Sequence, residues 1–336
     1  MNQVFFKVLI ISILCIISSN AQYHPPIQNF TPDVYKAGNQ NWNISRDDNN
    51  RIYVANNFGL LEFDGLRWTL HPTPDGSIMR SVFVKNNIVF TGAYMDFGYW
   101  LRNENGTLAY TSLANTVGFQ TIEDEQFWNI FSHKQYILFQ SLNRLVIYNQ
   151  QSNTLKTYTS EYGILDAFVN DDEIYFQDNN RTLFKIENEK SLVYLSAAAL
   201  NQNQVVGLVN TSVGQLIVTR ENGLFLNARN LKATQPQLSK SLAQDVVYSF
   251  TQAANGQLIL GTVKNGVYIL SERGALVHHI NVDSGLNNDT VLSVFSDNRG
   301  VWLGLDDGLA YVKLEAAIQQ YNPQREAIGT AYATIV

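Results

Sequence analysis

A motif that returns about every 41 residues is the feature that most constrains how this chain can fold. Each copy holds a β-rich run, a polar turn, a second β-rich run, an Asn-Gly-like turn and a third run. Four clear copies occupy residues 51–63, 215–225, 257–268 and 300–310, and three weaker copies occupy residues 88–100, 136–148 and 173–186. The equivalent strand position is taken in turn by Tyr53, Val89, Leu138, Tyr175, Ile217, Ile259 and Trp302.

The length and pattern of the repeat indicate a β-propeller. A unit of about 40 to 45 residues with several strands is typical of a propeller blade. Helical repeats of similar length would need a 3.6-residue periodicity, whereas these runs alternate or are continuously apolar. Asn and Gly suit the turns because they reach positive φ at little cost, and the turns near Arg144 and Arg181 must be built differently. We therefore predict an all-β, seven-bladed β-propeller of four-stranded blades, with almost no helix.

The two ends of the chain carry different signals. Lys7, the apolar run 8–17 and small residues before Gln22 predict a signal peptide over residues 1–21; an uncleaved N-terminal anchor is the alternative. Residues 22–318 form the predicted propeller, and residues 319–336 form a linker and the first strand of a further repeat. That strand, 327–336, either closes the ring by pairing with the first blade or begins a second propeller. Its end inside an apolar run favours the second interpretation, a truncation.

Composition and motifs exclude several functions. The net charge of −6 provides no basic surface for nucleic acid. None of the five histidines has zinc-motif spacing, and the only cysteine, Cys15, lies in the signal peptide. No nucleophile elbow, phosphate-binding loop or dinucleotide fingerprint is present. No stretch after the signal peptide resembles a membrane span. We therefore expect a periplasmic or extracellular chain without catalytic residues, metal or cofactor.

Two N-terminal segments and one late repeat carry a family resemblance. Residues 38–44 and 52–65 with Trp68, followed by residues 95–100, resemble the first two blades of periplasmic sensor propellers in bacterial two-component regulators. Residues 297–304 are similar to the repeat of those propellers, and the likeness covers roughly residues 30–316. The resemblance implies a second propeller, a triple-tyrosine β-sandwich, one membrane helix and a cytoplasmic output. That output is a histidine kinase or a helix-turn-helix DNA-binding domain, and this chain departs from the pattern by ending after the first propeller.

The candidate site lies at one axial face, where the loops leading into the innermost strands converge. In this alignment those loops contain Asn41, Gln126 and Gln204, and the six candidate ligand-binding residues Trp42, Arg80, Trp128, Asp166, Asp245 and Asp289. Aromatic rings stack on sugar faces, and amides or carboxylates bind hydroxyls, so this mixture suits a carbohydrate. The alternative is that the tryptophans pack between blades and the polar residues are structural.

These observations predict an exported, non-catalytic sensor for a carbohydrate or other envelope signal. Its expected partner is an oligosaccharide or another small ligand, and a homodimer is expected in the full-length receptor. Two alternatives stay open because propellers host many activities. One is a propeller-scaffold enzyme, such as a lyase or glycan hydrolase. The other is a propeller that assembles with other proteins through its blade edges and loops.

Overall fold

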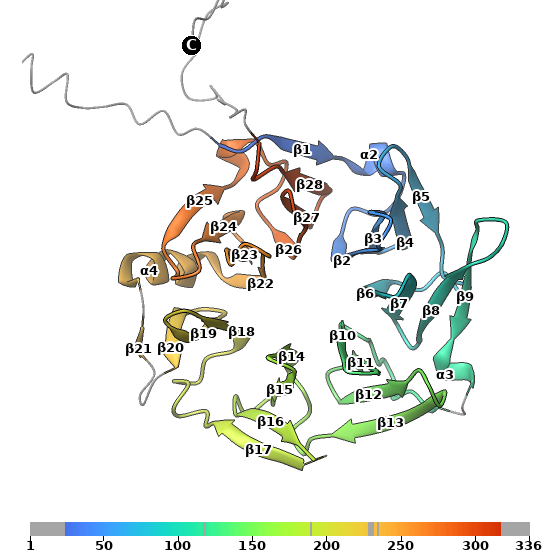
Figure 1. Cartoon of the computed structure of the whole chain (residues 1–336), viewed down its shortest axis with the longest axis horizontal. Coiled ribbons are helices and arrows are strands. Elements are labelled where there is room, and N and C mark those ends of the chain that lie inside the picture. Colours follow the sequence, from blue (N-terminus) through green and yellow to red (C-terminus); the bar gives the residue numbers. More distant parts are fainter. Residues whose placement is uncertain (1–23, 117–118, 189, 228–231, 234, 317–336) are drawn as a thin grey trace, which may run out of the picture.

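Seven four-stranded antiparallel sheets surround a central axis in the computed structural model of the chain (Figure 1). The structure describes residues 24–116, 119–188, 190–227, 232–233 and 235–316. The expected signal peptide and the tail over residues 327–336 lie outside the described residues. The predicted all-β, seven-bladed architecture is confirmed.

Each blade is built from the axis outward. The innermost strands are β2 (Asn41–Arg46), β6 (Met79–Lys85), β10 (Asn129–His133), β14 (Asp166–Asn170), β18 (Val205–Thr211), β22 (Val247–Gln252) and β26 (Val291–Ser296). The second strands are β3 (Ile52–Asn56), β7 (Ile88–Ala93), β11 (Tyr136–Gln140), β15 (Glu173–Gln177), β19 (Gly214–Thr219), β23 (Leu258–Thr262) and β27 (Val301–Leu305). The third strands are β4 (Gly59–Phe63), β8 (Phe97–Arg102), β12 (Arg144–Asn149), β16 (Leu183–Glu187), β20 (Gly223–Asn227), β24 (Val267–Leu270) and β28 (Leu309–Val312). The outermost strands are β5 (Trp68–His71), β9 (Leu108–Ser112), β13 (Thr154–Thr159), β17 (Lys190–Leu195), β21 (Lys232–Ala233), β25 (Leu276–Ile280) and, in the seventh blade, β1 (Ile27–Phe30).

The ring is closed by a strand from the beginning of the chain. β1 pairs antiparallel with β28, so that Ile27 opposes Val312 and Phe30 opposes Leu309. The Phe30 ring stacks on Trp302 with the ring centroids 5.6 Å apart. Phe30 also contacts Trp68 of the first blade at 5.4 Å. The first and seventh blades are therefore joined by a strand that the repeat pattern did not reveal.

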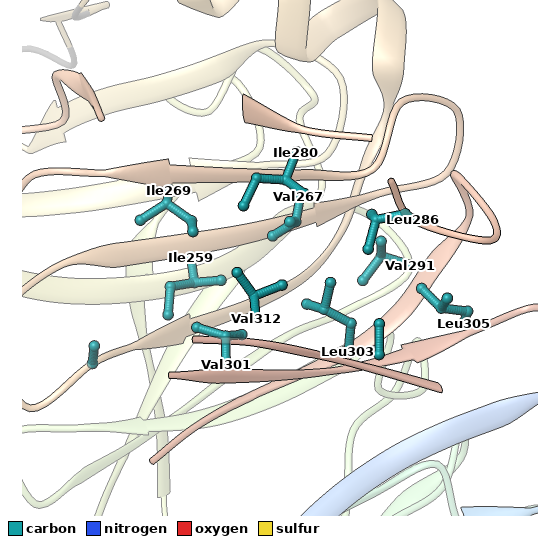
Figure 2. Packing of buried hydrophobic residues seen from close by; sticks show 12 residues of the cluster. Ile259, Val267, Ile269, Ile280, Leu286, Val291, Val301, Leu303, Leu305 and Val312 are labelled. Carbon is teal, nitrogen blue, oxygen red and sulfur yellow. The ribbon is translucent and has the colours of Figure 1, made fainter. Parts of the chain in front are cut away.

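The hydrophobic core is divided among the contacts between neighbouring blades. All seven equivalent positions of the sequence repeat lie in second strands, and their side chains are buried. Figure 2 shows one such contact, in which Ile259, Val267 and Ile269 of the sixth blade pack near Val301 and Leu303 of the seventh. Burying these β-branched and leucine side chains stabilises the ring because no blade can cover its own apolar face.

Blades approach each other most closely near the axis. The Ser81 hydroxyl donates to the Phe127 carbonyl of the third blade at 2.8 Å, and Ser293 donates to the Asn41 carbonyl at 3.2 Å. Gly304 lies opposite Asn41 at the second of these contacts, and an added Cβ would overlap the Asn41 carbonyl oxygen. A side chain larger than hydrogen at position 304 would therefore push the first and seventh blades apart.

Four short helical segments are present among the described residues. They are α2 (Pro32–Tyr35), α3 (Leu113–Thr116), α4 (Pro236–Asp245) and the 3-10 turn η1 (Val282–Ser284). The largest, α4, is ten residues long and occupies the connection between the fifth and sixth blades. The prediction of almost no helix is confirmed for the described residues. No described helix combines the length and apolar character that crossing a membrane would require.

Two turns differ from the others, as their arginines predicted. Arg181 itself takes a left-handed φ of +68°. Arg144 instead begins β12, and the turn before it is closed by the Ser141 N–H donating to the Arg144 carbonyl at 2.9 Å. The Arg144 side chain then pairs with the buried Glu125 carboxylate through Nη2 and Oε2, 2.7 Å apart. Arg144 therefore holds the loop that precedes the third blade in place.

Candidate functional site

A cavity of about 780 Å³ lies along the axis of the ring and is lined by residues from all seven innermost strands. This volume is within the range of about 300 to 1,000 Å³ that small-molecule sites usually have. The site residues reach this cavity because of a recurring backbone irregularity.

One side chain at the start of the innermost strand of each blade points to the axis, and in five blades a β-bulge places it there. In five blades the pairing with the second strand skips one residue. Trp128 and Leu165 hold the same place in the third and fourth blades, where their backbone N–H groups donate to the backbone carbonyls of Gln140 and Gln177 at 2.8 Å. A bulge leaves its extra residue unpaired and turns its side chain away from the regular alternation. The seven residues at this position, all of which line the cavity, are Trp42, Arg80, Trp128, Leu165, Val206, Tyr248 and Leu292.

The Arg80 side chain is held between two indole rings. Its guanidinium carbon lies 4.4 Å from the Trp42 ring centroid and 4.6 Å from that of Trp128. The two indoles contact each other edge to face, with their centroids 5.9 Å apart. Arg80 Nε also donates to Gln126 Oε1 at 2.7 Å, and Trp42 Nε1 donates to Asn57 Oδ1 at 2.7 Å. These contacts fix the guanidinium and leave its two terminal nitrogens without a protein partner among the described residues.

Burial shifts the pKa values of two groups near this cluster in opposite directions. It lowers the pKa of Arg80, although an arginine stays protonated throughout the physiological range. It raises the pKa of Tyr248, which keeps the phenol neutral. Both guanidinium groups near that phenol, those of Arg80 and Arg220, oppose this effect through their charge. Arg220 lies with its guanidinium carbon 5.3 Å from the Tyr248 ring centroid.

Asp166 is the one acidic residue at this end of the cavity. Desolvation raises the pKa of its carboxyl group to about 7, although the Ala167 N–H and the positive charge of Arg220 lower it. One carboxyl oxygen, Oδ1, accepts from the Ala167 N–H at 2.9 Å. Asp166 therefore changes between a proton donor and an acceptor near neutral pH.

Four of the six candidate residues, Trp42, Arg80, Trp128 and Asp166, line the cavity, and two lie elsewhere. Asp245 ends α4, where its carboxylate accepts from the Tyr268 hydroxyl at 2.5 Å and from Asn265 Nδ2 at 3.1 Å. Asp289 accepts from the Val282 N–H at 2.8 Å. Both aspartates fix loops of the sixth and seventh blades and are not part of the cavity lining, so the structure does not bring all six into one ring. Of the other loop residues, Gln204 lines the cavity, whereas Asn41 and Gln126 do not.

Two lining residues, Arg220 and Tyr248, were missed by the sequence alignment. The signal for Tyr248 was present, because it precedes Ile259 by eleven residues just as Trp42 precedes Tyr53. Arg220 follows directly after β19, in a segment that the sequence pattern assigned to a hairpin turn. A residue at the end of a second strand reaches the same axial face as the start of an innermost strand, since the two strands are antiparallel.

The side chains that line the cavity are suited to binding a ligand. The lining offers guanidinium donors, an amide, a phenol, indole rings and one carboxyl group of raised pKa. No histidine lines the cavity, and the described residues contain no group of three His, Cys, Asp or Glu that could hold a metal ion.

Comparison with known proteins identifies the fold. No family profile matches the sequence, and no curated protein does. Among solved structures, the chain is similar to the extracellular domain assigned to the hybrid two-component system BT4673 of B. thetaiotaomicron. The TM-score is 0.68 at 19% identity, covering 88% of this chain and 40% of that one. The corresponding domain of BT3049 from B. thetaiotaomicron gives a TM-score of 0.67 at 16% identity, with 87% and 42% covered.

A propeller enzyme is comparably similar. Catalytically inactive virginiamycin B lyase from Staphylococcus aureus, solved with quinupristin, gives a TM-score of 0.67 at 12% identity. That match covers 87% of this chain and 100% of the lyase. At such identities the likeness shows the fold alone. The structural matches confirm, at the level of fold, the resemblance to two-component sensor propellers, and this chain spans about two fifths of the length of those domains.

Proposed function

We propose that this chain is the N-terminal ligand-sensing propeller of an exported two-component-type regulator, and that it binds an oligosaccharide in the central cavity without catalysis. The observation that carries the proposal is the Arg80 guanidinium, fixed between Trp42 and Trp128 with its terminal nitrogens facing no protein partner in the described residues. A donor that is already oriented loses little freedom when a ligand binds, which favours affinity.

The chemistry of the lining supports a polyhydroxylated ligand. Arg80 and Arg220 provide charge-assisted donors, while Asp166 and Gln204 provide acceptors. Arg80 covers one face of each indole, so a sugar ring could stack only on the opposite face of Trp42 or Trp128. Hydrogen bonds to hydroxyls, more than stacking, are therefore expected to decide affinity in this cavity.

The place of this domain in a signalling protein is also part of the proposal. Similar structures are extracellular domains of two-component systems, and this chain corresponds to less than half of each. In such an arrangement the chain would sense its ligand outside the cytoplasm. Any kinase or DNA-binding output would belong to a part of the regulator that this chain does not contain.

An enzyme is the second candidate, because the lyase has the same fold and Asp166 can exchange a proton near neutral pH. General acid–base catalysis usually needs a second, matched group across the substrate. Tyr248 is held neutral, and no histidine or second acid lies at this end of the lining. Mass spectrometry of oligosaccharides incubated with the protein separates the two candidates. We expect unchanged glycans, and turnover that Asp166→Asn abolishes would identify an enzyme.

Calorimetry of the predicted mature chain, residues 22–336, against neutral and acidic oligosaccharides tests the binding proposal. Arg80→Ala should weaken the best ligand by roughly 1.5 to 3 kcal/mol, the usual contribution of a hydrogen bond to a charged group. Arg273→Ala is the matched control, because Arg273 is exposed in the turn between β24 and β25 and should leave binding unchanged. The proposal fails if no oligosaccharide binds, or if both variants bind as the wild type does.

A further inference from the structure

Two arginines at one end of the central cavity have no carboxylate partner among the described residues, whereas three other arginines of the ring do. Arg144 pairs with Glu125, and Arg51 and Arg102 both pair with Glu62. Arg80 and Arg220 line the cavity instead. Neither has a carboxylate within ion-pairing distance among the described residues. The fold thus leaves two positive charges uncompensated in a chain whose net charge is −6.

Both arginines line the same axial end of the cavity as Tyr248. The Arg220 guanidinium carbon lies 5.3 Å from the Tyr248 ring centroid, and Arg80 holds the position in the second blade that Tyr248 holds in the sixth. The Tyr248 hydroxyl has no hydrogen-bond partner among the described residues, and the same holds for the Arg220 guanidinium. Unpartnered donors from the second, fifth and sixth blades therefore converge at this end.

The negative charges of the lining do not cancel this pair. Asp166 lies at the same end, and desolvation raises the pKa of its carboxyl group to about 7, which reduces its negative charge at neutral pH. Asp171 lies just beyond the other end of β14 and accepts a hydrogen bond from Asn210 Nδ2. The length of that strand, roughly 16 Å at 3.3 Å per residue, separates Asp171 from the arginines. The arginine end is therefore positive whether or not Asp166 is ionised.

We infer that this end of the cavity binds the carboxylate of an acidic sugar between the guanidinium groups of Arg80 and Arg220, with the Tyr248 hydroxyl as a further donor. The inference rests on the proposed function and names its ligand class. A guanidinium presents paired N–H donors in a geometry that matches a carboxylate. A singly charged group fits better than a dianion, because Asp166 adds negative charge beside the site as its proton is lost.

The decisive comparison uses two probes that differ only in charge. Calorimetry of the mature chain with trigalacturonate and with its methyl ester should show about tenfold tighter binding of the acid. Arg220→Gln should remove that preference, so that the acid and the ester bind the variant with equal affinity. Arg273→Gln, at an exposed turn, should keep the preference, and circular dichroism should show that both variants are folded. Raising the salt concentration should shrink the difference between the probes, as screening requires.

Each other outcome has a distinct meaning. Equal affinity for acid and ester, or a preference that survives in Arg220→Gln, overturns the inference and leaves the sugar-binding proposal intact. Inorganic phosphate that binds as tightly as trigalacturonate would show a general oxyanion site and would overturn the assignment to a carboxylated sugar. A neutral oligosaccharide that binds when trigalacturonate does not also refutes the inference alone. If no oligosaccharide binds, the proposed function fails with it.

Discussion

The guanidinium of Arg80 lies 4.6 Å from the ring centroid of Trp128, a residue of the next blade. The same guanidinium lies 4.4 Å from the ring centroid of Trp42 in the preceding blade, and the two indoles contact each other edge to face. Three consecutive blades therefore meet in one aromatic and cationic contact beside the axis. The contact arises because all three side chains occupy the equivalent position at the start of the innermost strand of their blades. Arg80 thus combines packing between blades with the ligand recognition proposed above.

The first prediction concerns the stability that this contact provides without ligand. Arg80→Ala should lower the free energy of unfolding by about 1 to 2 kcal/mol, because a cation–π contact contributes about 0.5 to 2 kcal/mol. Urea denaturation measures the change, and Arg273→Ala should leave the midpoint unaltered because Arg273 is exposed. Equal midpoints for the two variants would show that the indoles hold their positions without the guanidinium.

The sequence predicted the parts of the site that depend on repetition. Tyr53 and its equivalents were correctly placed in second strands because burial between blades imposes apolar residues at a fixed interval. The same interval placed Trp42, Arg80 and Trp128 at strand starts. It could not place Asp245, because the helix α4 occupies that connection and directs the carboxylate to Tyr268 and Asn265. Irregular insertions between blades leave no periodic signal.

Ring closure was missed for a related reason. β1 is four residues long, and the repeat pattern cannot show that its partner is the strand β28 at the far end of the chain. Closure is a contact between the two ends of the ring, whereas sequence periodicity reports only neighbouring copies. The Arg144 turn differs in this respect, since an arginine at a position that favours glycine is visible in the sequence itself.

The second prediction tests that closure. Phe30→Ala should lower the free energy of unfolding by about 3 to 5 kcal/mol, because a buried aromatic ring is removed from contact with Trp302 and Trp68. Phe58→Ala provides the control, since Phe58 is exposed in a turn of the first blade. Urea denaturation of both variants decides the matter. A Phe30→Ala protein as stable as the control would mean that β1 does not hold the ring together.

The third prediction concerns the buried pair of Arg144 and Glu125. Burial alone would raise the pKa of Glu125, but hydrogen bonds from Arg144, the Ile122 N–H and Ser141 Oγ hold it below its ordinary value. The charged carboxylate therefore stabilises the fold above the unfolded-state pKa, and this contribution is lost as the pH falls through the lower folded-state pKa. Glu125→Gln should cost about 3 to 5 kcal/mol at pH 7, since it leaves Arg144 without its partner.

A surface pair supplies the comparison for Glu125. Lys185 pairs with Glu173, whose side chain is 39% exposed. Glu173→Gln should change the free energy of unfolding by less than about 1 kcal/mol, as is usual for exposed pairs. The difference between wild type and Glu125→Gln should shrink as the pH is lowered below about 4.5. A difference that stays constant with pH would assign the loss to packing and not to charge.

The fourth prediction concerns Asp166, whose pKa is shifted in the opposite direction to that of Glu125. Desolvation raises the pKa of its carboxyl group to about 7 in the folded protein, above the value of about 3.9 expected in the unfolded chain. The folded state therefore binds more protons between about pH 4 and 7, and stability contributed by the neutral acid is lost as the pH rises through this window. The asparagine of Asp166→Asn does not titrate. As the pH rises through this window, the free energy of unfolding of the variant relative to wild type should therefore increase by up to about 1.4 kcal/mol per pH unit. Unfolding curves measured at several pH values check the difference, and carbon NMR of the Asp166 carboxyl group reports its pKa directly. Parallel stability curves for the two proteins would show that the carboxyl group is well solvated within the cavity.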